Sequence, residues 1–294
     1  MSNNWPLYGA IEAGGTKFVL GTGTSPINLT ARHTIPTRTP GETLPEAAAW
    51  FHNQGRLSAI GIATFGPAVV DPKDGRWGRI TNTPKPGWAD CDLAGFFGRE
   101  FGVPIGFDTD VNGAALAESR FGAGEDANSL AYVTVGTGIG GGLVLDGKAV
   151  HGAAHPEMGH IFPRRHESDA AFEGVCPTHG DCLEGLASGP AIMRRWGKSL
   201  SELPEDHAAH AVIAHYLAHL CHTIFAMSSA EVIVLGGGVM NTPGLLDRIR
   251  ATERELDRGY LPAAAIHRIV KPSLGDDAGI IGALCLAMEA DKGR

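Results

Sequence analysis

The sequence lacks the features of several specialised classes of protein. It has no uninterrupted apolar run of about eighteen residues, the length that spans a bilayer. Its start, Met1–Pro6, has no basic stretch followed by an apolar one, so it predicts no secretory signal. We therefore expect a cytoplasmic protein without a membrane partner.

Cysteine and basic charge are both scarce. Five cysteines among 294 residues are few, and odd in number, for a framework of disulfide bonds. The 24 Lys and Arg against 32 Asp and Glu give a net charge of −8, which disfavours nucleic acid as a partner. We expect reduced cysteines that serve a metal site or catalysis.

Glycine, by contrast, is abundant. The chain has 41 glycines among 294 residues, roughly twice the usual share. They follow neither an every-third register nor a repeated polar tract, so collagen and low-complexity structures are excluded. We expect these glycines at turns where a ligand approaches the backbone closely.

Strands and helices alternate in the predicted pattern, which is typical of an α/β fold, and the length suggests about two domains. Strands are expected over 7–12, 18–21, 31–34, 59–64, 105–108, 130–135, 143–145 and 231–235. Helices are expected over 42–54, 93–101, 111–121, 190–196, 207–227, 245–256 and 278–290. A strand, a glycine turn and a second strand occur twice, which indicates a duplicated domain with a ligand cleft between its halves.

The first glycine turn offers donors to an anion. Gly14 and Gly15 leave backbone amides accessible, and Thr16 and Lys17 add side-chain donors. The spacing of a Walker P-loop occurs nowhere in the chain, and a strand rather than a helix follows this turn. The alternative is an ordinary hairpin turn.

The second glycine turn is expected over 136–142. It matches the pattern G-x-G-x-x-G, but the helix that a dinucleotide-binding site requires does not follow. We interpret the two turns as opposed hairpins that hold one polyphosphate. A third run, Gly236–Gly238, follows a strand and is interpreted either as a platform for a base or ribose or as a tight turn.

A polar cluster lies where a strand is expected to end and a helix to begin. Asp110 is the candidate base, because phosphoryl transfer needs a carboxylate that accepts the proton of the alcohol. Asp108 is interpreted instead as a cap of the helix that follows.

The spacing Cys-x₂-His-x₂-Cys at Cys176, His179 and Cys182 predicts a metal site. The alternatives are a buried thiol pair or a redox couple. A tetrahedral site needs a fourth ligand, for which His160 is a candidate and His151, His155 and His166 are competitors. The two histidines of 155–160 do not have the spacing of a zincin.

Together these motifs resemble the ROK family of bacterial sugar kinases, within the actin/hexokinase-like superfamily of ATPases. The resemblance spans nearly the whole chain. It lies in Glu12–Lys17 (family D-x-G-G-T-K), Thr109–Asn112 (N-D-x-N), Gly136–Gly142, Glu157–His160 (E-x-G-H), Cys176–Glu184 and Gly236–Gly238. Glu12, Thr109 and the spacing of the metal loop depart from the commoner pattern in a way that is similar to the bacterial fructokinase subgroup.

The resemblance implies two ribonuclease-H-like domains around a central cleft. The small domain would comprise residues 1–112 plus about 275–294, and the large domain residues 113–274. The implied reaction is transfer of a phosphoryl group from ATP to D-fructose. It also implies Mg²⁺ near Glu12, a structural zinc and a homodimer. The alternatives are a glucokinase, a kinase of N-acetylhexosamines or N-acetylmannosamine, or a sugar-responsive regulator, although the eleven residues before Glu12 leave no room for a DNA-binding module.

The same resemblance assigns the site residues. The sugar pocket would be formed by Gly66, Asn82, Thr109, Asp110, Glu157, His160 and Glu184, with Asp110 as the catalytic base. The nucleotide would contact Gly14, Gly15, Thr16, Lys17, Thr137, Gly138, Gly236, Gly237 and Gly238. Zinc would be bound by His160, Cys176, His179 and Cys182.

Overall fold

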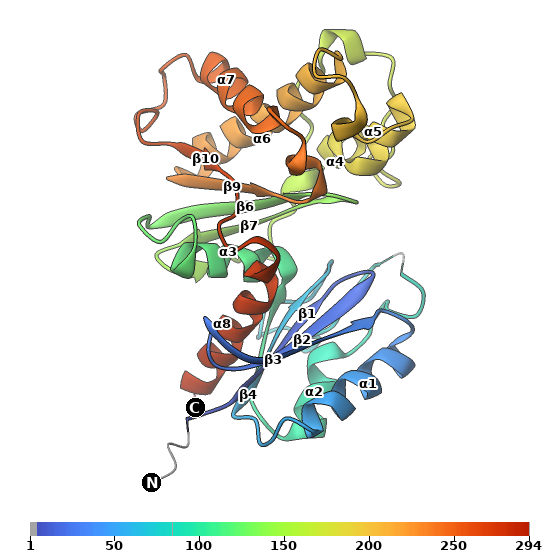
Figure 1. Cartoon of the computed structure of the whole chain (residues 1–294), viewed down its shortest axis with the longest axis vertical. Helices are drawn as coiled ribbons and strands as arrows, with labels where there is room; N and C mark the ends of the chain where they lie inside the picture. The colour runs from blue at the N-terminus through green and yellow to red at the C-terminus, as the bar shows by residue number, and fades with distance from the viewer. Residues whose placement is uncertain (1–4, 84, 294) are drawn as a thin grey trace. The chain divides into compact units, whose positions relative to one another are not determined.

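The computed structural model describes residues 5–83 and 85–293, and the chain divides into two compact units, each with its own five-stranded sheet (Figure 1). Unit 1 comprises residues 1–121, 149–155 and 274–294, and unit 2 comprises residues 122–148 and 156–273. These ranges differ from the predicted domains in two respects. The helix that begins at Asp110 stays whole in unit 1, because it packs against the C-terminal helix, and residues 149–155 return to unit 1.

The sheet of unit 1 has the strand order β3-β2-β1-β4-β5. Its strands are β1 (Tyr8–Ala13), β2 (Lys17–Ser25), β3 (Asn28–Pro36), β4 (Ala59–Thr64) and β5 (Ile105–Thr109). β1 pairs antiparallel with β2 and parallel with β4, and β4 pairs parallel with β5. Hence the carboxyl ends of β1, β4 and β5 meet at one edge, where the first glycine turn and Asp110 follow them.

Four helices pack with this sheet: α1 (Pro40–His52), α2 (Leu93–Phe101), α3 (Asp110–Phe121) and α8 (Ala278–Lys292). Two glycines let α8 approach the strands closely. An added Cβ on Gly61 of β4 would lie 1.8 Å from the Ala283 carbonyl oxygen, and one on Gly106 of β5 would lie 2.2 Å from that of Leu286. Backbone-to-backbone packing therefore attaches the C-terminal helix to unit 1.

Unit 2 repeats this topology. Its strands are β6 (Ser129–Val135), β7 (Ile139–Leu145), β8 (Lys148–Ala149), β9 (Val232–Gly236) and β10 (Arg268–Val270). Their order, β10-β9-β6-β7-β8, is that of unit 1 when β6 to β10 are matched to β1 to β5 in chain order. The corresponding pairs also run in the same directions, antiparallel for β6 and β7 and parallel for β6 with β9 and β9 with β10. The predicted duplication and α/β class are confirmed.

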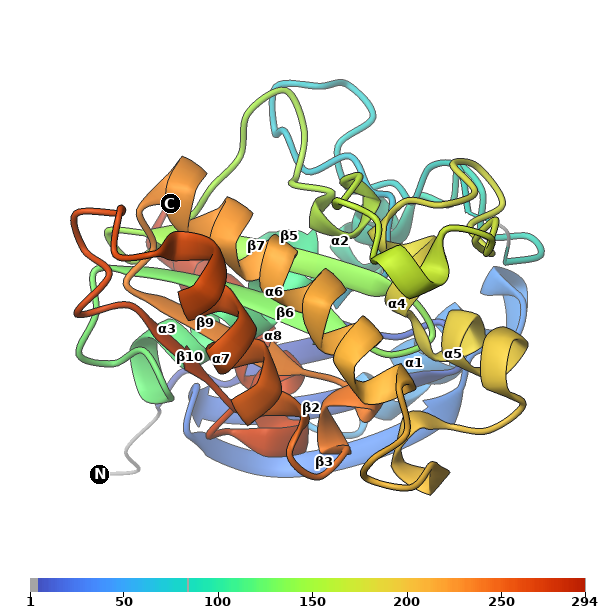
Figure 2. The same ribbon diagram turned by 90° about the horizontal axis from the view of Figure 1, so that it is seen from above.

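The helices of unit 2 are α4 (Leu183–Ala187), α5 (Gly189–Trp196), α6 (Ala209–Ser228) and α7 (Leu245–Asp257). α6 and α7 lie side by side across the sheet (Figure 2). By length and composition α6 is the one helix of the described residues that is apolar enough to span a membrane. Tyr216 and Leu217 of α6 are fully buried in the core of unit 2, as expected of a core helix.

One predicted turn was too long. The structure has strand β7 from Ile139, so only residues 136–138 form the connection between β6 and β7. Gly140, Gly141 and Gly142 pair in register with Thr134, Val133 and Tyr132 of β6. Glycine keeps its backbone donor and acceptor, so a run of glycines next to a paired strand can extend that strand.

Candidate active site

Asp110 is the first residue of α3, directly after strand β5. Its Oδ1 accepts a hydrogen bond from the N–H of Val111 at 2.9 Å. Thr109 is buried, and its Oγ1 accepts the N–H of Asn112 at 3.2 Å. Thr109 therefore caps the helix, and Asp110 lies where the helix N-terminus favours a negative charge.

Asp108 is not the cap that the sequence predicted, because its side chain belongs to a buried polar cluster. Its Oδ1 accepts hydrogen bonds from the N–H of Thr109 and from the side chain of Asn112, each at 2.7 Å, and its Oδ2 lies 2.8 Å from Nε2 of His151. The hydrogen bond with Asp108 raises the pKa of His151. His151 thus ties residues 149–155 to the end of β5.

The first glycine hairpin, residues 14–17, connects β1 and β2. The N–H of Gly14 donates to the carbonyl of Lys17 at 2.9 Å, and the Thr37 hydroxyl donates to the carbonyl of Gly14 at 2.7 Å. Lys85 donates to the carbonyl of Gly15, a contact that the sequence did not suggest. Gly15 and its two following residues are exposed, as a hairpin that meets an anion requires.

Glu12 lies at the end of β1, beside this hairpin. Burial raises the pKa of its carboxyl, Lys17 and Arg32 oppose the rise, and Asp276 and Asp277 add to it. A carboxyl group that is buried near two other acids would be stabilised in its charged form by a cation.

The second glycine hairpin, residues 136–138, lies at the edge of a cavity of about 580 Å³ within unit 2. The cavity is lined by Gly136, Thr137, Gly189, Pro190, Ile192, Met193, Ser199, Leu200, Ser201, Gly238, Val239 and Thr242. Its wall combines apolar side chains with hydroxyl groups, which suits a ligand that has a flat apolar part and polar substituents. The residues from 189 to 201 were not predicted, since no motif marks them.

The third glycine run divides between two roles. Gly238 lines the cavity, whereas Gly236 and Gly237 serve the packing of strand β9 on β6. Gly237 has φ +90°, and an added Cβ would lie 2.5 Å from the carbonyl oxygen of Val135. Only glycine fits there. The lining of this cavity thus includes only the last of the three predicted contacts.

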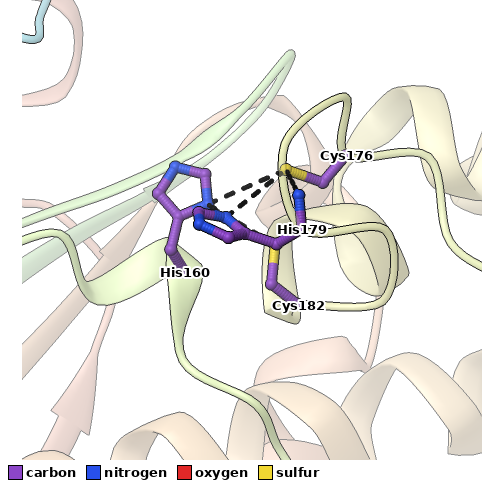
Figure 3. Close-up of side chains that lie close together, drawn as sticks. All are labelled: His160, Cys176, His179 and Cys182. Carbon is purple, nitrogen blue, oxygen red and sulfur yellow. Dashed lines mark hydrogen bonds between the residues drawn. The ribbon is translucent and has the colours of Figure 1, made fainter.

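Four side chains of unit 2 converge as a possible metal site: His160, Cys176, His179 and Cys182 (Figure 3). His160 ends a short 3₁₀ helix, and the other three lie in one loop. The four ligand atoms lie within 4.8 Å of one another. Of the competing histidines, His151 and His155 belong to unit 1, and Nδ1 of His166 accepts the N–H of Ser168.

The distances among these four ligand atoms fit an ion with tetrahedral coordination. Zinc with bonds of about 2.05 Å to nitrogen and about 2.3 Å to sulfur separates two nitrogens by about 3.4 Å and nitrogen from sulfur by about 3.6 Å. The Nδ1 atoms of His160 and His179 are 3.3 Å apart, and His160 Nδ1 lies 3.4 Å from Cys182 Sγ and 3.9 Å from Cys176 Sγ. The donor set and its dimensions therefore fit zinc.

Burial, with the neighbouring thiol of Cys176, raises the pKa of Cys182 to about 11. Two adjacent buried thiols do not both ionise at neutral pH without a compensating cation. The loop itself closes through two backbone hydrogen bonds between Cys176 and Gly180, whose φ of +65° favours glycine. Arg165 ties the loop to its surroundings through an ion pair with Asp181 at 2.8 Å.

The predicted sugar residues occur in both units. Gly66, Asn82, Thr109 and Asp110 belong to unit 1, and Glu157, His160 and Glu184 belong to unit 2. Glu157 is exposed and its carboxylate lies 3.9 Å from Nε2 of His160. Asn82 is exposed, and a Cβ on Gly66 would lie 3.7 Å from the ring of His155.

Two sheets of one topology, each with a glycine hairpin between its first two strands, define the actin/hexokinase-like class of ATPase. Residues 8–290 match the ROK family. The chain is 48% identical to a fructokinase of Zymomonas mobilis subsp. mobilis, over 99% of this chain and 100% of that protein. It is 40% identical to a fructokinase of Pediococcus pentosaceus, over 97% and 99%. The crystal structure of a ROK hexokinase from Thermus thermophilus superposes with a TM-score of 0.80 at 28% identity, covering 98% of this chain and 100% of that one.

This chain belongs to the ROK family. The resemblance that the sequence motifs indicated is thereby confirmed.

Proposed function

We propose that this protein is an ATP-dependent fructokinase that converts D-fructose and ATP into fructose 6-phosphate and ADP. The observation that carries the proposal is similarity over nearly the full chain to proteins named fructokinase. The fold supports it, because each unit presents a glycine hairpin at the place where this class of ATPase holds phosphate.

In the proposed reaction Asp110 acts as general base. Its carboxylate accepts the proton of the C6 hydroxyl while that oxygen forms a bond to the γ-phosphorus of ATP, and the bond from phosphorus to the ADP oxygen breaks. Its place at the start of α3 supports this role, because the N-terminus of a helix favours a negatively charged side chain.

The nucleotide would be held by three parts of the chain. The amides of Gly15 and Thr16 and of Thr137 and Gly138 would bind phosphate oxygens, with the charge of Lys17 nearby, whereas the N–H groups of Gly14 and Gly136 donate within their own hairpins. The cavity of unit 2, with Gly238 in its wall, would take the adenosine. Mg²⁺ bound near Glu12 would neutralise phosphate charge, and the raised pKa of Glu12 supports a cation there.

We also infer that the four His and Cys side chains of unit 2 bind a structural zinc. The distances among their ligand atoms support this inference. Zinc would fix the turn that carries Glu157 and the loop that leads to Glu184, so that both carboxylates could accept hydrogen bonds from sugar hydroxyls.

The cytoplasmic location and the homodimer stay predictions. All five cysteines lie in the described residues and none forms a disulfide bond, which suits the reducing cytosol. A homodimer follows from the family resemblance and is tested by light scattering of the purified protein.

The proposed reaction is tested by ³¹P NMR of protein mixed with D-fructose, ATP and Mg²⁺. We expect ADP and fructose 6-phosphate in equal amounts. ADP without a sugar phosphate, or unchanged ATP, would contradict the proposal.

A further inference from the structure

Glu184 makes a contact that a place in the sugar pocket does not explain. It lies on α4, two residues after Cys182, and its side chain is half-buried. Its Oε2 accepts a hydrogen bond from the backbone N–H of Ile139 at 2.9 Å. Ile139 is the first residue of β7 and directly follows the hairpin 136–138. The carboxylate therefore fixes one end of this hairpin.

The Glu184 carboxylate lies directly beside Gly138, where a side chain would begin. A Cβ added to Gly138 would lie 2.7 Å from Oε2 of Glu184, closer than a real Cβ contact. The φ of Gly138 is outside the left-handed region, so backbone strain does not exclude a larger residue here. A Cβ at this position would instead displace the Glu184 carboxylate, which accepts the N–H of Ile139.

The segment after Glu184 fixes the other end of the hairpin. The N–H of Gly189, which begins α5, donates to the carbonyl of Gly136 at 2.7 Å, and the N–H of Ser188 donates to the carbonyl of Glu184 at 3.2 Å. Both anchors thus come from the short stretch that follows the last metal ligand, Cys182.

The turn that carries His160 packs on the same point. A Cβ added to Gly159 would lie 1.8 Å from the carbonyl oxygen of Ile139. Ile139 is therefore held by Glu184 through its N–H and by Gly159 through close packing at its carbonyl. Glu184 lies two positions after Cys182 and Gly159 lies one position before His160, so both are close in sequence to a candidate zinc ligand.

We propose that Glu184 is a positioning residue for the nucleotide. One of its oxygens fixes the N–H of Ile139 and so sets the hairpin 136–138 that borders the adenosine cavity. Its other oxygen stays available for a sugar hydroxyl, so that one carboxylate couples the sugar pocket to nucleotide affinity. The identity of the nucleotide rests on the proposed function.

The first test measures binding of Mg²⁺ and ADP by calorimetry without sugar, so that it does not depend on turnover. For Glu184→Ala we expect a Kd about tenfold above that of wild type, because a buried N–H loses its acceptor. Glu184→Gln should stay within about threefold of wild type, because the amide oxygen can still accept this N–H. The matched control is Glu255→Ala, an exposed acid of α7, which should bind ADP like wild type.

The second test uses Gly138→Ala in two backgrounds. In wild type it should raise the Kd for ADP about tenfold, whereas in Glu184→Ala it should add less than about threefold, because the oxygen that the new Cβ meets is gone. Equal factors in the two backgrounds, or wild-type affinity in Glu184→Ala, would overturn the proposal. If Glu184→Ala does not fold, two variants that keep the acceptor still test the proposal: ADP affinity like that of wild type in Gly138→Ala, or a loss of about tenfold in Glu184→Gln, would overturn it.

Activity assays separate this proposal from the proposed function. If wild type binds no ADP and forms no sugar phosphate, the kinase assignment itself is wrong. If wild type is active and Glu184→Ala changes only the KM for fructose, with the KM for ATP unchanged, then the positioning role is wrong and the kinase assignment stands. We expect Glu184→Ala to raise both KM values and Glu184→Gln to raise mainly that for fructose.

Discussion

Asp110 is the residue on which the proposed chemistry depends. Strand β5 ends just before it at the edge of the sheet, and at the start of α3 its Oδ1 accepts the backbone N–H of Val111. Thr109 caps helix α3, and the side chain of Asp108 belongs to a buried polar cluster. Three adjacent polar residues thus have three separate roles, which spacing alone could not distinguish.

The substitution Asp110→Asn keeps the shape of this side chain but removes its ability to accept a proton. We expect kcat to fall by about 10²- to 10⁴-fold, with the KM for fructose changed by less than about threefold. Steady-state kinetics with fructose and ATP measure both values. A kcat like that of wild type would refute the assignment of the base.

His151 makes the stability of unit 1 dependent on pH. Asp108 raises its pKa above the unfolded value of about 6.5, with Asp71 adding to this effect and partial burial opposing it. The stabilisation is therefore full below about pH 6.5 and is lost as the pH rises through the folded pKa. The side chain is 35% exposed, so we expect about 1 kcal/mol or less.

The corresponding measurement compares urea unfolding midpoints of wild type and His151→Gln. The midpoint difference should be larger at pH 6 than at pH 9. An equal difference at both pH values would show that the ion pair with Asp108 adds nothing.

At the scale of elements, the metal loop was the most predictable part of the site. Cys-x₂-His-x₂-Cys determines its own geometry, because ligands three positions apart in a turn with glycine face one another. The fourth ligand was left open among four histidines. The family resemblance pointed to His160, and the structure brings its Nδ1 within 3.4 Å of Cys182 Sγ from a separate turn that packs on β7.

The substitution Cys176→Ser removes one sulfur from this set. We expect the zinc content to fall below one equivalent per chain and the melting temperature to fall by about 5 °C or more, because a structural zinc contributes folding energy. Mass spectrometry of the metal and thermal unfolding measure the two quantities. The control is Cys91→Ser, which replaces a half-buried thiol of unit 1. This variant should contain as much zinc as wild type. Full stability in wild type stripped of metal would contradict a structural role.

Most helices were predicted closely, the nine-residue strands β2 and β3 were predicted too short, and the shortest elements were missed. Strand β4 and helix α2 match their predicted ranges residue for residue. An apolar run marks the extent of β4, and Gly102 marks the end of α2. Helix α4, with five residues, and strand β10, with three, were not predicted. Their sequences are too short to show a period, and tertiary packing forms them.

At the scale of the whole molecule, the duplication could be predicted from two glycine hairpins, but the limits of the units could not. Residues 149–155 belong to unit 1 although the chain on both sides belongs to unit 2. The contacts that hold this stretch, such as His151 with Asp108, join positions 43 apart. Pairings of this kind leave no local signal in one sequence.

The lining of the cavity proposed for the nucleotide could not be predicted for the same reason. Met193 lies on α5, Ser199 directly precedes the 3₁₀ helix 200–202 and Thr242 directly follows the 3₁₀ helix 238–241, and none of the three belongs to a motif. The sequence therefore suggested residues for contact with phosphate or metal, because that chemistry restricts the residue type. It did not reveal those that only give a pocket its shape.

The central claim is that the protein is a kinase that prefers D-fructose. The most direct measurement is kcat/KM from ADP release with D-fructose, D-glucose, D-mannose, N-acetyl-D-glucosamine and N-acetyl-D-mannosamine at saturating ATP. We predict that the value for D-fructose is at least about tenfold above every other, as loss of one well-placed hydrogen bond would give. A higher value for glucose or for an N-acetyl sugar, or no ADP release with any of the five, would contradict the account.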